Sequence, residues 1–562
     1  MRPGGQLTSP LSAESRQVIR RSEMTRRANR RLSEPGRSGN LVCYHRLAKI
    51  RCATEESLAP NLHRRSFLKA ASRLGKVAAA GSILPIGLST LGSLARLQAK
   101  TPTPEPLIQP SEARSANGIL DATITAAPGP VRLGDRTFGG LLYNGAYVPP
   151  TLRARLGDTL RITFRNNLID RSRLNQSDYL GPICTSANRP QDCPSNLHFH
   201  GMSVSPQGNS DNVFIHVHPY KTFQYVVRIP ASGRQGPGLF WYHPHAHGFV
   251  NDQILGGMSG ALVVEGIDEI FPLLQGSPER FFLIKHVKLA DETEIVSING
   301  QINPVVAMRA GEMQFWRIAH IGASEFYKIR FEGVPLYVVA TDGHALSQPR
   351  KVTEFFIGPG ERIDAIAIGP PAGEYPMRTI SFQNEAWRPP EPVLQLAVIT
   401  SSGLSPNAAL EDEVLRQRVA GPQWIDDVRA APIARRRTLV YSRTADRKVF
   451  MIDGRVIDEA RTDQTVKLGD AEEWTVVNTD QQYHSFHIHQ TPFLVTEVGG
   501  VSWNDNSLRD TFSVPPATDQ GPGVLKVVIP FTDPAIVGRF VYHCHAVDHE
   551  DRGMMGVIEV VA

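Results

Sequence analysis

The chain has 562 residues, of which 41% are hydrophobic, and its 60 Lys and Arg against 55 Asp and Glu give a net charge of +5. Since a typical domain has about 150 residues, this length predicts several domains and excludes a single core. Residues 1–99 hold 18 Lys and Arg against 5 Asp and Glu, so the remainder carries a net charge of −8, and the basic balance does not indicate a nucleic-acid partner.

Residues 1–99 are expected to be a leader that is removed from the mature protein. Paired arginines followed by Phe-Leu-Lys within residues 61–72, and then a long apolar run, resemble a twin-arginine export signal with cleavage before Lys100. The alternative is a membrane anchor, which Arg73 and Lys76 disfavour because charges weaken a spanning helix. We expect the twin-arginine export machinery to deliver the protein to the periplasm or the medium, without stable membrane insertion after cleavage.

The positions of the cysteines are consistent with export to an oxidising compartment. Cys43 and Cys52 leave with the leader, and Cys544 lies in a metal-ligand motif described below. Cys184 and Cys193 remain, nine residues apart in a polar segment, and can pair outside the cytosol. A disulfide closing so short a loop would contribute about 2.5 kcal/mol. The alternative is that both cysteines stay reduced and pack in the protein.

After the leader, the chain is expected to be all-β. Residues 159–164, 223–229 and 473–477 are rich in β-branched, aromatic and aliphatic side chains and are bounded by Gly, Pro, Asn and Asp. No long amphipathic helical pattern competes with these segments.

A short pattern recurs three times: a glycine and an acidic residue, followed by a strand-like segment. It is found at Gly157-Asp158, Gly311-Glu312 and Gly469-Asp470, at intervals of 154 and 158 residues. The spacing predicts three related β-sandwich domains. We place them at residues 105–267, 275–400 and 435–562, with residues 401–437 as a surface linker.

The segment from Val541 to Gly556 is the densest in metal-ligand side chains. His549 follows Cys544 by five residues and Met554 follows it by ten, which matches a copper bound by thiolate, imidazole and a weak axial thioether. His543 and His545 flank the cysteine, and side chains alternate between the faces of a strand. One tripeptide would therefore serve two metal centres.

Three further motifs contain closely spaced histidines. They are His198 and His200, then His243 and His245, and last His484, His487 and His489. Together the four motifs hold ten of the eighteen histidines in the chain. One His-x-His pair is usually an ordinary feature of a strand, but four such motifs, the last around a cysteine, indicate a metal-binding protein.

These motifs resemble those of the multicopper oxidases, the three-domain group that includes laccases, bilirubin oxidases and bacterial cuprous oxidases. The resemblance covers nearly all of the chain after the leader, and it implies three consecutive cupredoxin-like Greek-key β-sandwich domains and four copper ions. It assigns a type 1 copper to His484, Cys544, His549 and Met554, a type 2 copper to His198 and His487, and a type 3 pair to His200, His243, His245, His489, His543 and His545.

The resemblance also implies the reaction. Phenols or aromatic amines would be oxidised one electron at a time at the type 1 copper, and O₂ would be reduced to water at the trinuclear cluster of the type 2 and type 3 ions. The ligand motifs fall in the first and third domains, so the cluster is expected at their interface, with the second domain as a spacer. Asp480 is expected beside His484, and Asp211 and Glu550 are expected to supply protons; the alternatives for the last two are a turn aspartate and a surface glutamate.

Two other functions stay open. One is a cuprous-ion oxidase or copper tolerance protein, although the eight methionines after the leader form no cluster that would suit Cu(I). The other is a non-catalytic copper-binding or cell-division scaffold of the same fold, which is expected to have lost ligand histidines. His216, His218 and His247 are expected to ligate no metal directly. We expect a monomer.

Overall fold

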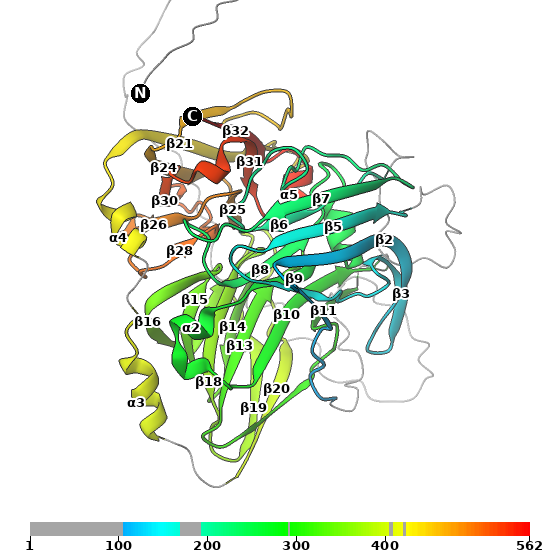
Figure 1. Cartoon of the computed structure of the whole chain (residues 1–562), viewed down its shortest axis with the longest axis vertical. Helices are drawn as coiled ribbons and strands as arrows, with labels where there is room; N and C mark the ends of the chain where they lie inside the picture. Colours follow the sequence, from blue (N-terminus) through cyan, green and yellow to red (C-terminus); the bar gives the residue numbers. More distant parts are fainter. Residues whose placement is uncertain (1–104, 169–192, 290, 292, 404–407, 420–422) are drawn as a thin grey trace, which may run out of the picture. The chain divides into compact units, whose positions relative to one another are not determined.

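The computed structural model describes residues 105–168, 193–289, 291, 293–403, 408–419 and 423–562. The expected leader with its twin-arginine signal, and Cys184 of the expected cysteine pair, lie outside these residues. The described strands form six sheets (Figure 1), which confirms the expected all-β chain. No helix among the described residues is both long enough and apolar enough to cross a membrane.

The first pair of sheets is formed by residues 112–264. One sheet has the order β1 (Glu112–Arg114), β4 (Thr151–Ala154), β9 (Gly260–Val264), β8 (Gly238–His243) and β6 (His198–His200). The other has the order β3 (Arg136–Tyr143), β2 (Ile119–Leu133), β5 (Thr159–Asn166) and β7 (Thr222–Arg228). Three short helices accompany them: α1 (Val250–Gly256), α2 (Ile267–Ile270) and the 3₁₀ helix η2 (Pro272–Leu274).

The second pair is formed by residues 279–402. Its larger sheet has the order β11 (Glu294–Ile298), β10 (Glu279–Lys288), β13 (Met313–His320), β18 (Arg362–Ile368), β15 (Leu336–Thr341) and β16 (His344–Val352). The smaller sheet has the order β12 (Val305–Arg309), β20 (Gln395–Ser402), β19 (Gly373–Thr379), β14 (Tyr327–Phe331) and β17 (Glu354–Ile357).

The third pair is formed by residues 433–561, coloured yellow to red in Figure 1. One sheet has the order β22 (Phe450–Ile452), β21 (Ile433–Arg443), β24 (Ala471–Asn478), β30 (Gly523–Pro530), β26 (Phe493–Val498) and β27 (Val501–Ser502), with β28 (Leu508–Arg509) on β26. The other has the order β23 (Gln464–Lys467), β32 (Met555–Val561), β31 (Gly538–Cys544), β25 (His484–Ile488) and β29 (Thr511–Val514). The 3₁₀ helix η3 (Pro534–Ile536) and the helix α5 (Val547–Asp551) flank β31.

The recurring glycine marks the same turn in each sandwich. Gly157, Gly311 and Gly469 have φ angles of 89°, 75° and 100°, which an L side chain rarely adopts. The amide of the acidic residue after each glycine donates to the carbonyl three residues earlier, at 3.1, 2.9 and 3.2 Å, as in a type II turn. Each turn follows a strand (β4, β12 or β23) that pairs in parallel with β9, β20 or β32, so the repeat in the sequence is a repeat in topology.

Each sandwich encloses its own apolar core. Phe164 and Tyr225 lie in the first core, Trp316 in the second and Trp474 in the third, all of them fully buried. Large buried aromatic side chains of this kind remove much apolar surface from water and hold the two sheets together.

The linker expected at residues 401–437 contains two helices, α3 (Ala408–Arg416) and α4 (Gln423–Ala430). Leu410 and Val414 of α3 are buried against an apolar cluster of the second sandwich, and Ile425 and Val428 of α4 are buried with third-sandwich side chains. The segment was expected to be a linker because it is rich in Ala, Pro, Ser and charge, but its Ala, Leu and Glu residues are also favourable to helix.

Candidate metal centre

Two strand pairs present the histidine motifs. His198 on β6 lies opposite His243 on β8 in the first sandwich, and His487 on β25 lies opposite His543 on β31 in the third. Alternation along each strand turns the intervening residues inward, since Phe199 packs in the first core and Cys544 in the third. The side chains of the flanking histidines therefore point away from the core, on the other face of the sheet.

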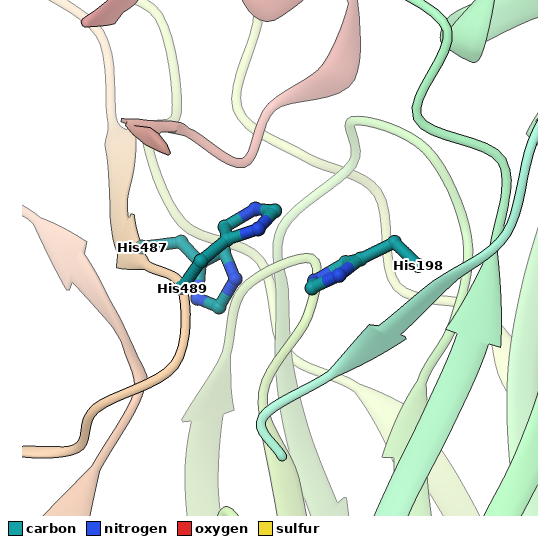
Figure 2. Close-up of side chains that lie close together, drawn as sticks. All are labelled: His198, His487 and His489. Carbon is teal, nitrogen blue, oxygen red and sulfur yellow. The ribbon is translucent and has the colours of Figure 1, made fainter. Parts of the chain in front are cut away.

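Eight of the expected ligand histidines form one buried cluster: His198, His200, His243, His245, His487, His489, His543 and His545. Figure 2 shows His198 of the first sandwich with its ring turned toward His487 and His489 of the third. The rings of His198 and His489 stack with centroids 3.9 Å apart, and those of His200 and His487 stack at 4.0 Å. Residues some 290 positions apart in the chain thus meet in one site.

The spacing of the ring nitrogens fits metal ions. His543 Nε2 lies 3.2 Å from both His245 Nε2 and His489 Nε2, and His200 Nδ1 lies 3.2 Å from His545 Nε2. Two nitrogens bound tetrahedrally to one metal, each about 2.0 Å from it, are about 3.3 Å apart. The nitrogens thus approach one another as co-ligands do.

Within the described residues, Nε2 of His198, His243 and His487 is buried without a hydrogen-bond partner. Buried polar atoms are nearly always paired, so these three need an explanation. A metal ion supplies one, because His198, His487 and His489 offer ring nitrogens within 4.8 Å of one another, and so do His198, His200 and His243.

Six imidazoles of the cluster are held neutral. Burial first, and then the neighbouring charges and imidazoles, keep the pKa well below its usual value for His200, His243, His245, His487, His489 and His545. A neutral imidazole has a free lone pair, which is the form that binds a metal.

Cys544, His484 and His549 form a second set of ligands. His484 Nδ1 lies 3.4 Å from Cys544 Sγ and 3.1 Å from His549 Nδ1, and Cys544 Sγ lies 3.6 Å from His549 Nδ1. Burial raises the pKa of the Cys544 thiol to about 12, so a bound cation must replace its proton for the thiolate to form. Thiolate with two imidazoles is a ligand set that copper favours.

Met554 is placed to supply the thioether. It is fully buried in the same apolar cluster as Cys544, whose amide donates to the Met554 carbonyl at 3.0 Å. Met555 points elsewhere and packs with Val541 and Val557 in a different cluster. Of the two neighbouring methionines, Met554 is therefore the one on the thiolate side.

Asp211 orients His198. Its Oδ1 lies 3.0 Å from His198 Nδ1 and accepts the amide hydrogen of Phe199 at 3.0 Å, while Gln490 Nε2 donates to Oδ2 at 2.9 Å. A carboxylate on one ring nitrogen fixes the tautomer and leaves the other nitrogen for a metal. Asp211 is itself 1% exposed, so this arrangement is shielded from water.

Glu550, on α5, faces the histidine cluster. Its Oε2 lies 3.1 Å from His543 Nδ1 and its Oε1 lies 3.6 Å from His245 Nε2. The side chain is fully buried, so the alternative of a surface glutamate is wrong.

Asp480 lies beside His484, with Oδ2 3.6 Å from His484 Nε2. Its other oxygen is 2.8 Å from the guanidinium of Arg443 and accepts the amide hydrogen of Gln481 at 2.8 Å. The carboxylate is buried and its charge is compensated by the arginine.

Asp510 and Arg362 belong to the site, although no motif pointed to them. Asp510 Oδ1 lies 3.0 Å from His200 Nε2, and its carbonyl lies 2.8 Å from His487 Nδ1. Arg362, on β18 of the second sandwich, donates to both oxygens of Asp510 at 2.7 and 2.6 Å. The second sandwich supplies no expected ligand, but it is more than a spacer because it anchors the residue that orients two of them.

The histidines that were expected to ligate no metal directly stand apart from these groups. His216 Nε2 lies 3.4 Å from Glu459, and neither His216 nor His247 joins a metal-ligand cluster among the residues that the structure describes.

Three family models, each described as multicopper oxidase, match residues 185–269, 275–403 and 432–562. The chain is also similar to a protein of Staphylococcus aureus named multicopper oxidase mco, with 23% identity over 468 residues, covering 79% of this chain and 89% of the relative.

Solved structures share the fold. A multicopper oxidase from Campylobacter jejuni, described as a metallo-oxidase, has a TM-score of 0.65 and 23% identity, and the match covers 82% of this chain and 96% of the other. A laccase-like multi-copper oxidase, CueO, from Ochrobactrum sp. has a TM-score of 0.64 and 21% identity, with 81% and 100% covered. These matches confirm three consecutive cupredoxin-like β-sandwich domains.

Proposed function

This chain belongs to the multicopper oxidase family, and from that premise we propose that it oxidises small electron-rich phenols or aromatic amines and reduces O₂ to water. Four donors each give one electron, and the four electrons with four protons convert one O₂ into two water molecules. The observation that carries the proposal is the meeting of eight buried histidines next to a cysteine that belongs to a separate ligand set.

We assign four copper ions to these side chains. His484, Cys544, His549 and Met554 would hold a type 1 copper, His198 and His487 a type 2 copper, and the other six cluster histidines a type 3 pair. When bound, the coppers supply the redox chemistry, accepting electrons singly and delivering them to O₂. The short contacts between ring nitrogens and the unpaired buried nitrogens support the assignment.

The protein chain connects the type 1 ligand set to the histidine cluster and supplies acidic side chains beside the cluster. Cys544 lies in one set while its neighbours His543 and His545 lie in the other, which supports electron transfer through one tripeptide. Glu550, in contact with His543, is placed to hold a proton beside the cluster. Asp211 is placed to keep His198 oriented and is the second candidate for proton supply.

A cuprous-ion oxidase is the second candidate function, because one structural neighbour is described as a metallo-oxidase. The methionines argue against a thioether-lined path for Cu(I). All eight that follow the leader are described; six are buried, and Met313 and Met451 are half-buried. Asp480, the carboxylate beside His484, is paired with Arg443 and so offers little attraction to a cation.

Two measurements test the proposal. The purified protein should hold close to four coppers and show an intense thiolate-to-copper band in the visible with a near-ultraviolet shoulder; a colourless protein with full copper content would contradict it. Oxygen uptake should then be compared with dimethoxyphenol and with cuprous ion. If cuprous ion gives about tenfold higher kcat/KM, and phenol is oxidised only with excess copper, the protein is a cuprous-ion oxidase and not a phenol oxidase.

We also propose export through the twin-arginine machinery to the periplasm or the medium, and a monomeric mature protein. The paired arginines near residue 64 and the apolar run after them support export. Cell fractionation of the wild type and of Arg64→Lys/Arg65→Lys tests the route, since the double variant should remain in the cytoplasm. Size-exclusion chromatography with light scattering tests the monomer, and mass spectrometry without reduction tests a Cys184–Cys193 disulfide.

A further inference from the structure

His549 is the most exposed residue of the type 1 ligand set. His549 is half-buried, whereas His484 and Cys544 are fully buried. Its Nδ1 faces Cys544 and His484, and its Nε2 lies 3.3 Å from the side-chain nitrogen of Gln482. Gln482 thus covers this nitrogen of the most exposed ligand, and a donor to the set would approach near Gln482.

Trp387 lies on the segment next to Gln482. Glu385 pairs with Gln482 in an isolated β-bridge, and the Ala386 amide donates to the Gln481 carbonyl at 3.0 Å. These two backbone contacts bring the Trp387 segment of the second sandwich alongside the residue that covers His549.

Three arginine side chains lie close to Trp387 and to the aromatic ring that stacks on His549. The guanidinium carbons of Arg443 and Arg447 each lie 4.0 Å from the centroid of the Trp387 ring, and Arg552 lies 4.6 Å from the centroid of Phe450. The Phe450 ring in turn stacks on His549 with centroids 4.0 Å apart. We call Trp387, Arg443, Arg447 and Arg552 the arginine patch.

The carboxylates near the arginine patch are already paired. Asp480 lies 2.8 Å from Arg443, Glu385 lies 3.1 Å from Arg388, and Asp548 forms an ion pair with Arg552.

The turn that carries Arg447 adds Asp446 and Lys448, both exposed. Asp446 is tied to the Thr444 hydroxyl at 2.6 Å and to the Lys448 amide at 3.3 Å. Among the described residues, no carboxylate forms an ion pair with Arg447. Its exposed guanidinium therefore has no direct ion-pair partner in the described part of the chain and lies next to an aromatic ring, while Glu385, which is paired with Arg388, interacts with it only electrostatically.

We propose that the arginine patch selects donors that carry an anionic group, namely phenols with a carboxylate or sulfonate substituent. This inference rests on the proposed oxidase function and names the donor class of the same site. Arg447 would bind the anionic group, Trp387 would offer an aromatic face to the donor ring, and the phenolic end would lie toward His549. Cuprous ion and protonated amines would be repelled by the charge of Arg447, since Arg443 and Arg552 are paired with carboxylates.

The reaction remains balanced for such a donor. Four phenols each lose one electron and the phenolic proton to give four phenoxyl radicals, while one O₂ takes up the four electrons and four protons to give two water molecules. The anionic substituent takes no part in the chemistry, so it changes binding and approach.

The test uses two donors that differ in charge, 4-hydroxy-3,5-dimethoxybenzoate and its methyl ester. In the copper-loaded wild type, raising the NaCl concentration from 10 to 150 mM should lower kcat/KM for the carboxylate more than for the ester, because salt screens exposed charges. Arg447→Gln should lower the ratio of kcat/KM, carboxylate over ester, about fivefold. The matched control is Arg436→Gln, an exposed arginine on the same strand as Arg443 that pairs with Glu473; it should leave the ratio unchanged.

A binding measurement separates recognition from turnover. Calorimetry on the copper-loaded wild type should show saturable binding of 3,5-dimethoxybenzoate, which has no phenolic hydroxyl. The wild type should bind 3,5-dimethoxybenzamide more weakly than this benzoate. The Arg447→Gln variant should bind the benzoate more weakly than the wild type does. Equal binding of acid and amide, or a donor ratio that changes less than twofold in Arg447→Gln, overturns the inference while the oxidase function stands. Absence of the visible band and of oxygen uptake with either donor overturns the oxidase function itself.

Discussion

Arg362 should be the most costly single side chain to remove at the histidine cluster. It is fully buried and donates to both oxygens of Asp510, to the Leu239 carbonyl at 3.1 Å and to the Gly360 carbonyl at 2.9 Å. Arg362→Leu leaves the Asp510 carboxylate, itself 2% exposed, without its charge partner. Breaking a buried ion pair in this way costs about 3 to 5 kcal/mol.

A double-mutant cycle isolates the free energy of the interaction between Arg362 and Asp510. Arg362→Leu, Asp510→Asn and the double variant should be compared by urea unfolding, with midpoints and slopes recorded by more than one probe because a chain of several domains need not unfold in two states. Since the double variant removes both charges of the Arg362–Asp510 pair, it should be less destabilised than the sum of the single variants by about 2 kcal/mol or more, although both variants that lack Arg362 also lose its 3.6 Å contact with Asp342.

A matched control shows whether the effect is specific to the cluster. Arg317 is another buried arginine of the second sandwich, paired with Glu279 and Asp364 and not with Asp510. Arg317→Leu should also destabilise, but only Arg362→Leu should reduce the near-ultraviolet shoulder and the copper content, because Asp510 orients His200 and His487. Additive single variants, or equal copper loss in both, would refute the reasoning.

Three further changes test the ligand and proton assignments. Cys544→Ser should abolish the visible band and donor oxidation while most cluster copper stays bound, which absorption and metal analysis would show; persistence of the band would exclude Cys544 as its source. Met554→Leu should raise the type 1 potential in a redox titration, because the weak thioether stabilises the oxidised ion; an unchanged potential would point to Met555 instead. Glu550→Gln should slow reoxidation by O₂ more than reduction by donor in stopped-flow traces, since an amide cannot deliver a proton, and equal slowing of both would count against proton delivery.

The ligand sets could be predicted because each motif is local in the chain. His543 and Cys544 are the last two residues of β31 and His545 follows directly, so strand alternation continued by one residue assigns the cysteine to the sandwich core and its neighbours to the other face. The meeting of the first and third sandwiches required the resemblance to a known family, because nothing in the sequence pairs His198 with His489, 291 positions away.

The surroundings of the ligands could not be predicted in this way. Asp510 and Arg362 are 148 residues apart, and Arg443 and Trp387 come from different sandwiches, so neither pair leaves a pattern along the chain. Asp480 shows the consequence. Its position beside His484 follows from sequence resemblance, but its pairing with Arg443, which weakens its attraction for a cation, does not.

The second sandwich helps to define the histidine cluster although it carries no ligand motif. Gly360 lies on the loop before β18 with a φ of 92°, and a Cβ there would be 3.1 Å from a ring carbon of His545 and 3.2 Å from one of His200. His545 belongs to the third sandwich and His200 to the first, so the three sandwiches meet at this glycine. Because Arg362 ties the same loop to Asp510, any shift of the second sandwich must move the residue that orients His200. The cluster ligands can therefore be correctly placed only when the second sandwich is packed in its native position.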